Sequence, residues 1–172
     1  MAKTCARFLR GGADFKAYEN AATEALKYAL SEHFAAWLTQ QGSETRISIY
    51  DLIGRISSDH DFWNTIVTQF HSRYVIFEFK NYTDKIGQGQ IYTTEKYLYK
   101  TALRATGIII SREGPDENAI AAAKGALREH GKLIINLTTD HLLEMLDLKD
   151  SGDDPTKIIV DLVDDMLMRL ER

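Results

Sequence analysis

Apolar and polar positions along the chain predict strands that alternate with helices. Strands are expected where short, largely apolar runs occur, at residues 45–56, 73–80, 107–111 and 132–137. Helices are expected where apolar residues recur at helical spacing, at residues 14–40, within 57–72, about 90–105, 115–131, 140–146 and 155–170. This order predicts an α/β fold in which a central mixed sheet is flanked by helices, with extra C-terminal helices.

The 172 residues are long enough for a sizeable core and are expected to form a single domain. Its core covers about 14–137, and a C-terminal helical extension covers about 138–172. Only two strands can be recognised before the helix that begins near residue 90, unless Gly54 folds residues 45–58 into a bent pair.

The strand at residues 73–80 ends in two charges. Its sequence, "YVIFEFK", begins as a strand buried on both faces, yet Glu78 and Lys80 are two residues apart and therefore share one side of the pleat. A buried charge costs several kcal/mol unless it is paired or binds a metal. In the simplest interpretation the two side chains pair with each other or reach water at the strand end.

A second acid stands on the preceding strand. In "RISIYD", Ile47, Ile49 and Asp51 alternate, which places Asp51 on an apolar strand face. Two carboxylates that converge at neighbouring strand ends repel each other unless a cation or a proton intervenes. Mg²⁺ binds few carboxylates and bridges phosphate oxygens, and a nearby lysine can orient the attacking water.

An aspartate followed by Glu-x-Lys on the next strand resembles the PD-(D/E)XK nuclease superfamily, which has the restriction-endonuclease-like fold. The resemblance covers about residues 14–137, and "FEFKNY" together with "GIIISREGPD" is most similar to the Mrr-like branch. It implies a core with three strands before the second helix. It also implies Mg²⁺-dependent hydrolysis of DNA phosphodiester bonds, with Mn²⁺ as a substitute, in host defence or DNA processing. The alternative is a non-catalytic module of this fold for nucleic-acid binding or assembly.

The resemblance assigns a role to each matching residue of the two strand ends. Asp51 and Glu78 would bind the metal, and the backbone carbonyl of Phe79 would supply a third oxygen. Lys80 would hold the attacking water. Asp61 remains an alternative first acid because 27 residues separate Asp51 from Glu78.

Two further residues match auxiliary positions of the family. Its members often carry a glutamate on the first helix, and Glu19 fits this position better than Glu24. A glutamine after the lysine strand is common in the Mrr-like branch, and Gln90 fits this position better than Gln88.

The distribution of charge agrees with a polyanionic partner. The net charge is −4, but residues 140–172 hold ten acidic and four basic side chains, a balance of −6 that leaves +2 for residues 1–139. Basic side chains near the site can contact DNA phosphates without reading sequence. The candidates for this contact are Arg112, Lys85 and Lys96.

Further partners follow from what the last helix shows and from what the chain lacks. The helix at 155–170 has an apolar stripe that either docks on its own domain or forms a homodimer. No helix-turn-helix or zinc finger is visible, so sequence specificity is weak or comes from a specificity or regulatory partner.

No apolar run approaches the roughly 18 residues of a membrane span, and the first residues lack the apolar stretch of a signal peptide. A cytoplasmic location without a membrane partner is therefore expected.

Overall fold

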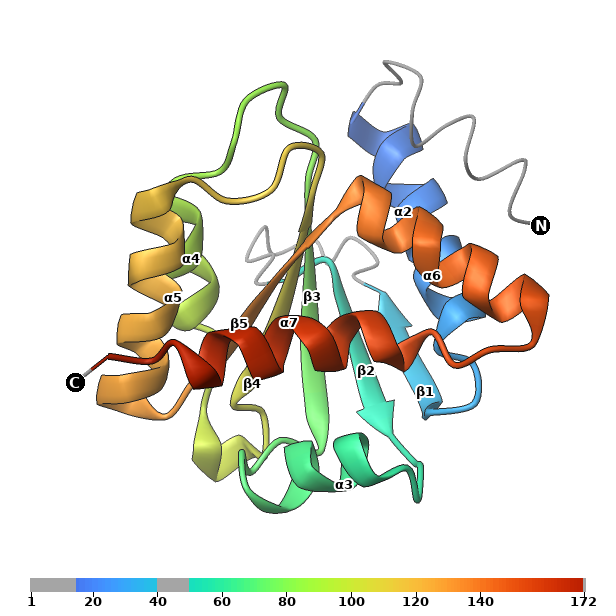
Figure 1. Ribbon diagram of the computed structural model, residues 1–172, viewed down its shortest axis with the longest axis horizontal. Helices are drawn as coiled ribbons and strands as arrows, with labels where there is room; N and C mark the ends of the chain where they lie inside the picture. Colours follow the sequence, from blue (N-terminus) through green and yellow to red (C-terminus); the bar gives the residue numbers. More distant parts are fainter. Residues whose placement is uncertain (1–14, 40–49, 172) are drawn as a thin grey trace, which may run out of the picture.

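A computed structural model describes residues 15–39 and 50–171. Within these ranges the protein has a five-stranded sheet and six α-helices (Figure 1). The strands are β1 (Phe34–Thr39), β2 (Leu52–Ile56), β3 (Tyr74–Lys80), β4 (Thr106–Ser111) and β5 (Leu133–Thr138). The helices are α2 (Phe15–Ala29), α3 (Asp61–Thr68), α4 (Gln88–Glu95), α5 (Glu117–His130), α6 (Thr139–Ser151) and α7 (Thr156–Met168).

The sheet changes direction at β3. The strand order is β1-β2-β3-β4-β5, with antiparallel pairing from β1 to β3 and parallel pairing from β3 to β5. Parallel strands need crossover connections, which α4 and α5 provide. The carboxyl ends of β3, β4 and β5 therefore lie at one end of the sheet, at the top of Figure 1, where Lys80, Ser111 and Thr138 end their strands. We call this end the carboxyl edge.

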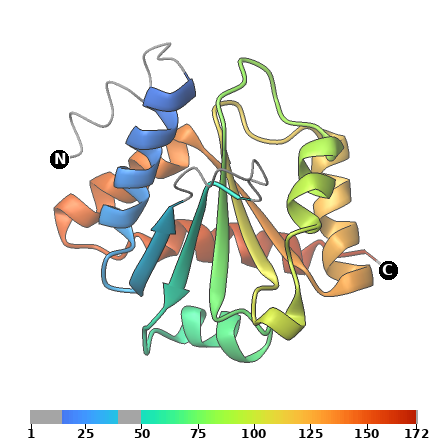
Figure 2. The same ribbon diagram turned by 180° about the vertical axis from the view of Figure 1, so that it is seen from behind.

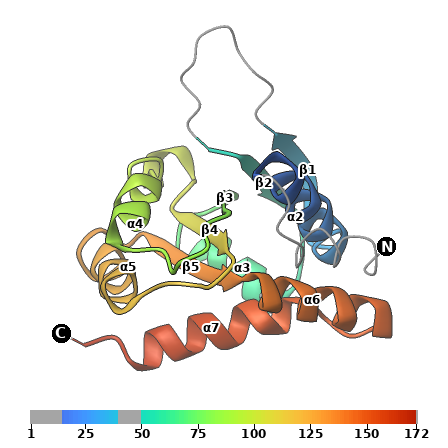
Figure 3. The same cartoon turned by 90° about the horizontal axis from the view of Figure 1, so that it is seen from above.

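Helices cover both faces of the sheet. Phe77, Ile108 and Ile135 belong to an apolar cluster with residues of α2, α3, α6 and α7. Their neighbours Ile76 and Ile109 pack with α4 and α5 on the opposite face. Figure 2 shows α2 and α6 on one flank of the sheet and α4 and α5 on the other, and Figure 3 gives the view onto the carboxyl edge. The predicted α/β fold with a mixed sheet and C-terminal helices is confirmed.

The apolar stripe of α7 docks on the chain's own domain. Ile159 and Val163 are buried in the same cluster as Phe77. The homodimer stays a prediction, and Ile159 and Val163 are already buried within the chain's own core. No helix in the described ranges is long and apolar enough to cross a membrane.

The prediction of one helix over residues 14–40 is wrong after Ala29. β1 follows instead, and it is the third strand before α4. The bent pair at Gly54 is wrong as well, because Gly54 lies within β2 and the register shift falls in β1, between Phe34 and Ala36. A Cβ atom on Gly54 would lie 2.6 Å from Phe34 Cδ1, so glycine makes room for the aromatic rings of β1.

The remaining elements lie close to their predicted positions. The predicted strand at 45–56 is described only from residue 50, where β2 begins at Leu52. The helix expected over 90–105 is shorter, because α4 ends at Glu95 and a single 3₁₀ turn follows at Lys100–Ala102. α5 begins at the cap Asp116 and ends at Gly131, whose φ of 61° suits glycine.

Candidate active site at the carboxyl edge

The register between β2 and β3 brings the two candidate metal ligands together. Leu52 pairs with Phe77, and continuing this antiparallel register by one residue sets Asp51 opposite Glu78. Opposed residues in antiparallel strands project from the same face of the sheet. The two carboxylates therefore lie near each other at the carboxyl edge, where the charge of Asp51 acts on Glu78.

A hydrogen bond fixes Asp51 against β3. Its Oδ2 accepts from the backbone N–H of Phe79 at 2.8 Å. Within a strand, the N–H and C=O of one residue point toward the same neighbouring strand. The Phe79 carbonyl is therefore directed toward Asp51, on the side expected of a third metal ligand.

Glu78 and Lys80 form an ion pair that leaves one carboxylate oxygen without a partner. Lys80 Nζ lies 3.1 Å from Glu78 Oε2, and the two side chains are 20% and 7% exposed. Glu78 Oε1 is buried and accepts no hydrogen bond. An orphan carboxylate oxygen in a buried site needs a proton, a water or a cation.

The carboxyl groups at this edge hold their protons more tightly than usual. Burial, followed by the charges of Asp51 and Glu19, raises the pKa of Glu78 to about 7 against the opposing effect of Lys80. Burial also raises the pKa of Asp51, although the Phe79 N–H and Lys80 oppose it. A divalent cation would relieve both effects because it favours the ionised form of each carboxyl group.

The donor set fits a small hard cation. Across residues 15–39 and 50–171, no group of three acidic, histidine or cysteine side chains is arranged to hold a metal by itself. The ion would be held by two carboxylates and a backbone carbonyl and would keep several waters. Mg²⁺ prefers such a partly hydrated arrangement.

The helix glutamate expected near the metal lies within electrostatic reach of the site. Glu19 stands on α2, pairs with Lys16 at 2.8 Å, and its charge raises the pKa of both Asp51 and Glu78. Glu24 is exposed farther along α2 and pairs with Lys27 at 3.4 Å. Glu19 is therefore the better placed of the two.

The structure brings Asp51, and not Asp61, beside Glu78. Asp61 is the first residue of α3 and is exposed. It follows the last residue of β2, whereas Asp51 precedes the first. The two aspartates consequently lie at opposite ends of the sheet.

Gln90, Lys85 and Lys96 have different positions. Gln90 Oε1 accepts from Gly87 N at 3.0 Å and closes the capping box of α4, and no described contact joins it to the carboxylates. Lys85 is exposed on the loop between β3 and α4, at the carboxyl edge. Lys96 caps the far end of α4, where Lys132 Nζ, just before β5, bonds the Glu95 carbonyl at 3.1 Å. Lys96 is therefore at the opposite end of the sheet from Lys80.

Arg112 lies at the carboxyl edge and is tied to residues that the sequence pattern did not reveal. Its Nε donates to Asn81 Oδ1, and its guanidinium carbon lies 4.8 Å from the centre of the Tyr18 ring. The Tyr18 hydroxyl and Thr139 Oγ1 are hydrogen-bonded at 2.9 Å. Asn81 directly follows Lys80, and this adjacency was the available signal.

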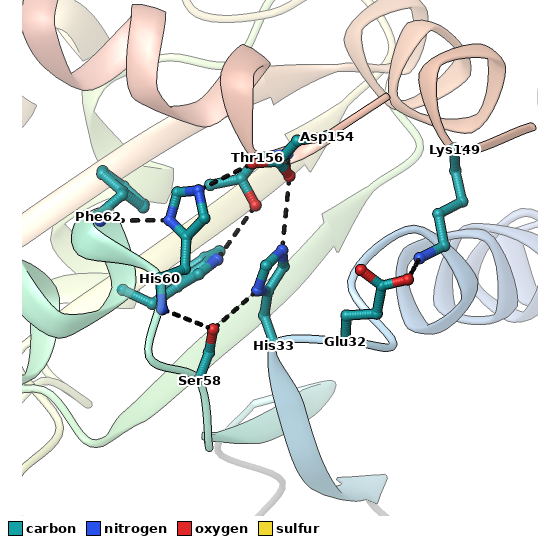
Figure 4. A network of polar contacts seen from close by, with 9 residues as sticks. Glu32, His33, Ser58, His60, Phe62, Lys149, Asp154 and Thr156 are labelled. Atoms are coloured by element: carbon teal, nitrogen blue, oxygen red, sulfur yellow. Dashed lines mark hydrogen bonds and ion pairs between the residues drawn. The ribbon is translucent and has the colours of Figure 1, made fainter. Parts of the chain in front are cut away.

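A second polar cluster, at the other end of the sheet, was also missed. Figure 4 shows His33, Ser58, His60 and Asp154, which we call the histidine junction. His33 Nδ1 lies 3.0 Å from Ser58 Oγ, and His60 Nε2 lies 2.8 Å from Asp154 Oδ2. His33 and Asp154 are far in the sequence from Ser58 and His60, so no motif spacing points to the cluster.

Comparison with known proteins adds no relative to this description. No family model matches the sequence, and searches of curated proteins and of solved structures found no match. The function must therefore be inferred from the site itself.

Proposed function

We propose that this protein is a metal-dependent nuclease with a restriction-endonuclease-like core, which hydrolyses DNA phosphodiester bonds in host defence or DNA processing. The supporting observation is the placement of Asp51 opposite Glu78, with Lys80 Nζ 3.1 Å from the Glu78 carboxylate. The three strands that precede α4 also support the proposal, although α3 stands between β2 and β3, where the implied core has no helix.

Each residue of the site has a role in this reaction. A bound Mg²⁺ or Mn²⁺ would activate water and stabilise negative charge on the phosphate. Asp51, Glu78 and the Phe79 carbonyl would hold the ion. The Lys80 ammonium would orient the attacking water and balance the charge that develops in the transition state. Glu19 would contribute a further carboxylate through water.

The surroundings of the site favour a polyanionic substrate. α5 and α6 begin at the carboxyl edge, so the partial positive charges of their N-termini face the same end of the sheet. Arg112 and Lys85 add two full positive charges there. Most of the excess acidic residues lie on α6, α7 and the turn between them, although Asp140 stands in the first turn of α6 at this edge.

Plasmid cleavage tests the proposal. We expect nicking or linearisation of supercoiled DNA with Mg²⁺, and no cleavage in EDTA or with Lys80→Ala. Lys96→Ala is the matched control, because this exposed lysine lies away from the site, and it should cleave like the wild type. Tight DNA binding without cleavage would favour the non-catalytic module. The absence of both binding and cleavage would reject a DNA-directed function.

A further inference from the structure

A buried hydroxyl group lies beside the catalytic lysine. In the parallel register of β3 and β4, Lys80 pairs with Ser111, and their side chains project from the same face of the sheet. Ser111 is 1% exposed, and its Oγ has no hydrogen-bond partner. Burying a hydroxyl without a partner costs free energy, so this serine does not help to hold the metal-free protein together.

The present partner of Lys80 has another role in the proposed reaction. Lys80 Nζ donates to Glu78 Oε2, while Glu78 Oε1 accepts nothing. When the Glu78 oxygens serve as metal ligands, they become poorer acceptors for the ammonium group. A largely buried ammonium then needs a new acceptor close by. Neighbouring strands are about 4.8 Å apart, so the long lysine side chain can reach Ser111 Oγ.

We propose that Ser111 is a positioning residue, whose Oγ accepts a hydrogen bond from Lys80 Nζ when Glu78 acts as a metal ligand. The serine thereby holds the ammonium beside the attacking water. The inference rests on the proposed nuclease function and adds that Ser111 controls the position of the Lys80 ammonium group.

Two other buried hydroxyl groups, on β4 and just before β3, provide controls for this role. Thr106, at the other end of β4, has an equally buried hydroxyl without a partner. Ser72 is also fully buried, but its Oγ accepts from the N–H groups of Ala105 and Thr106 at 3.0 and 2.8 Å. Thr106 thus represents an orphan hydroxyl away from the site, and Ser72 represents a structural one.

The test compares Ser111→Ala with Thr106→Val and Ser72→Ala. In EDTA, Ser111→Ala should keep or raise the wild-type melting temperature, whereas Ser72→Ala should lower it. With Mg²⁺, Ser111→Ala should lower kcat about tenfold, the effect of a loss near 1.4 kcal/mol, and leave DNA affinity unchanged. Thr106→Val should change neither kcat nor affinity.

A measurement independent of turnover completes the test. With lysine side chains labelled for NMR, addition of Mg²⁺ should move the Lys80 signal differently in Ser111→Ala and in the wild type. Unchanged kcat and an unchanged Lys80 response in Ser111→Ala would overturn the inference and leave the nuclease intact. A lower melting temperature in EDTA, as for Ser72→Ala, would also overturn it by showing a structural role. A wild type that does not cleave would instead reject the proposed function and this inference with it.

Discussion

The two ends of the sheet carry polar clusters that differ in whether their buried polar atoms have partners. At the carboxyl edge, Glu78 keeps an orphan oxygen and its pKa is raised by burial. In the histidine junction, Asp154 contacts both His33 and His60, and it also accepts from Thr156 N at 2.8 Å. Although burial opposes it, these partners lower the pKa of Asp154. A cluster whose polar atoms all have partners can stabilise the fold. A cluster with an unpartnered buried atom lowers stability, and a bound ligand can restore it.

The hydrogen bonds of the junction indicate the tautomer of the neutral His60 ring. The Phe62 N–H donates to His60 Nδ1 at 3.2 Å, so the proton of the neutral ring is on Nε2 and faces Asp154. His33 has partners at both ring nitrogens, and burial lowers its pKa. The junction joins the start of β1, the loop after β2 and the turn between α6 and α7 (Figure 4). It therefore fastens the C-terminal helices to the core.

The largest difference between the two clusters should appear in activity. Glu78→Gln removes a proposed metal ligand at nearly constant shape, and cleavage should fall roughly a thousandfold or more, since the ion provides much of the transition-state stabilisation. The same change leaves the largely buried Lys80 ammonium without its counter-ion, so the melting temperature in EDTA should fall. Plasmid cleavage and thermal unfolding measure the two effects. Wild-type cleavage by Glu78→Gln would remove Glu78 from the mechanism.

The pH dependence of stability should have opposite signs at the two ends. The pKa of Glu78 rises from 4.5 to about 7 on folding, so the unfolded chain loses this proton first. In EDTA the free energy of unfolding should therefore fall as the pH rises from 4.5 to 7, by at most about 1.4 kcal/mol per pH unit. Burial lowers the pKa of His33, so the unfolded chain binds this proton first. The contribution of His33 to the free energy of unfolding is therefore lost as the pH falls below 6.5.

Urea unfolding at several pH values checks these signs. Between pH 4.5 and 7, the free energy of unfolding of Glu78→Gln should fall less steeply with rising pH than that of the wild type. With saturating Mg²⁺, this difference between the two proteins should be absent. His33→Gln should lose less free energy of unfolding than the wild type as the pH falls below 6.5. An unchanged slope in Glu78→Gln would contradict the raised pKa of this carboxyl group.

The sequence was sufficient for most of the fold, but not for β1. Strands β3, β4 and β5 are apolar on both faces and have little helical character. β1 contains "FAAWLT", and its alanines favour a helix when considered locally. Pairing with β2, and the packing of Phe34 and Trp37 over Gly54, outweigh that preference.

The candidate site shows the same limit. The neighbourhood of Asp51, Glu78 and Lys80 could be predicted because strand periodicity places charged residues on faces and the family resemblance links the two strand ends. Ser111 could not, because its place beside Lys80 depends on the register of β3 with β4, which a pattern does not specify. Lys96 was expected near the site because it is close to Lys80 in the sequence. It lies at the opposite end of the sheet because α4 runs away from the carboxyl edge.

The smallest effect should come from breaking the junction. Asp154→Ala removes the acceptor of His60 and of the Thr156 N–H at the start of α7, and it should lower the free energy of unfolding by about 1–2 kcal/mol. Asp153→Ala, an exposed neighbour, is the matched control and should change stability little. Because the junction lies at the end of the sheet away from Lys80, Asp154→Ala should cleave DNA like the wild type below its melting temperature. A loss of cleavage in a fully folded Asp154→Ala protein would mean that the two ends are coupled, and the distinction between a structural and a catalytic cluster would fail.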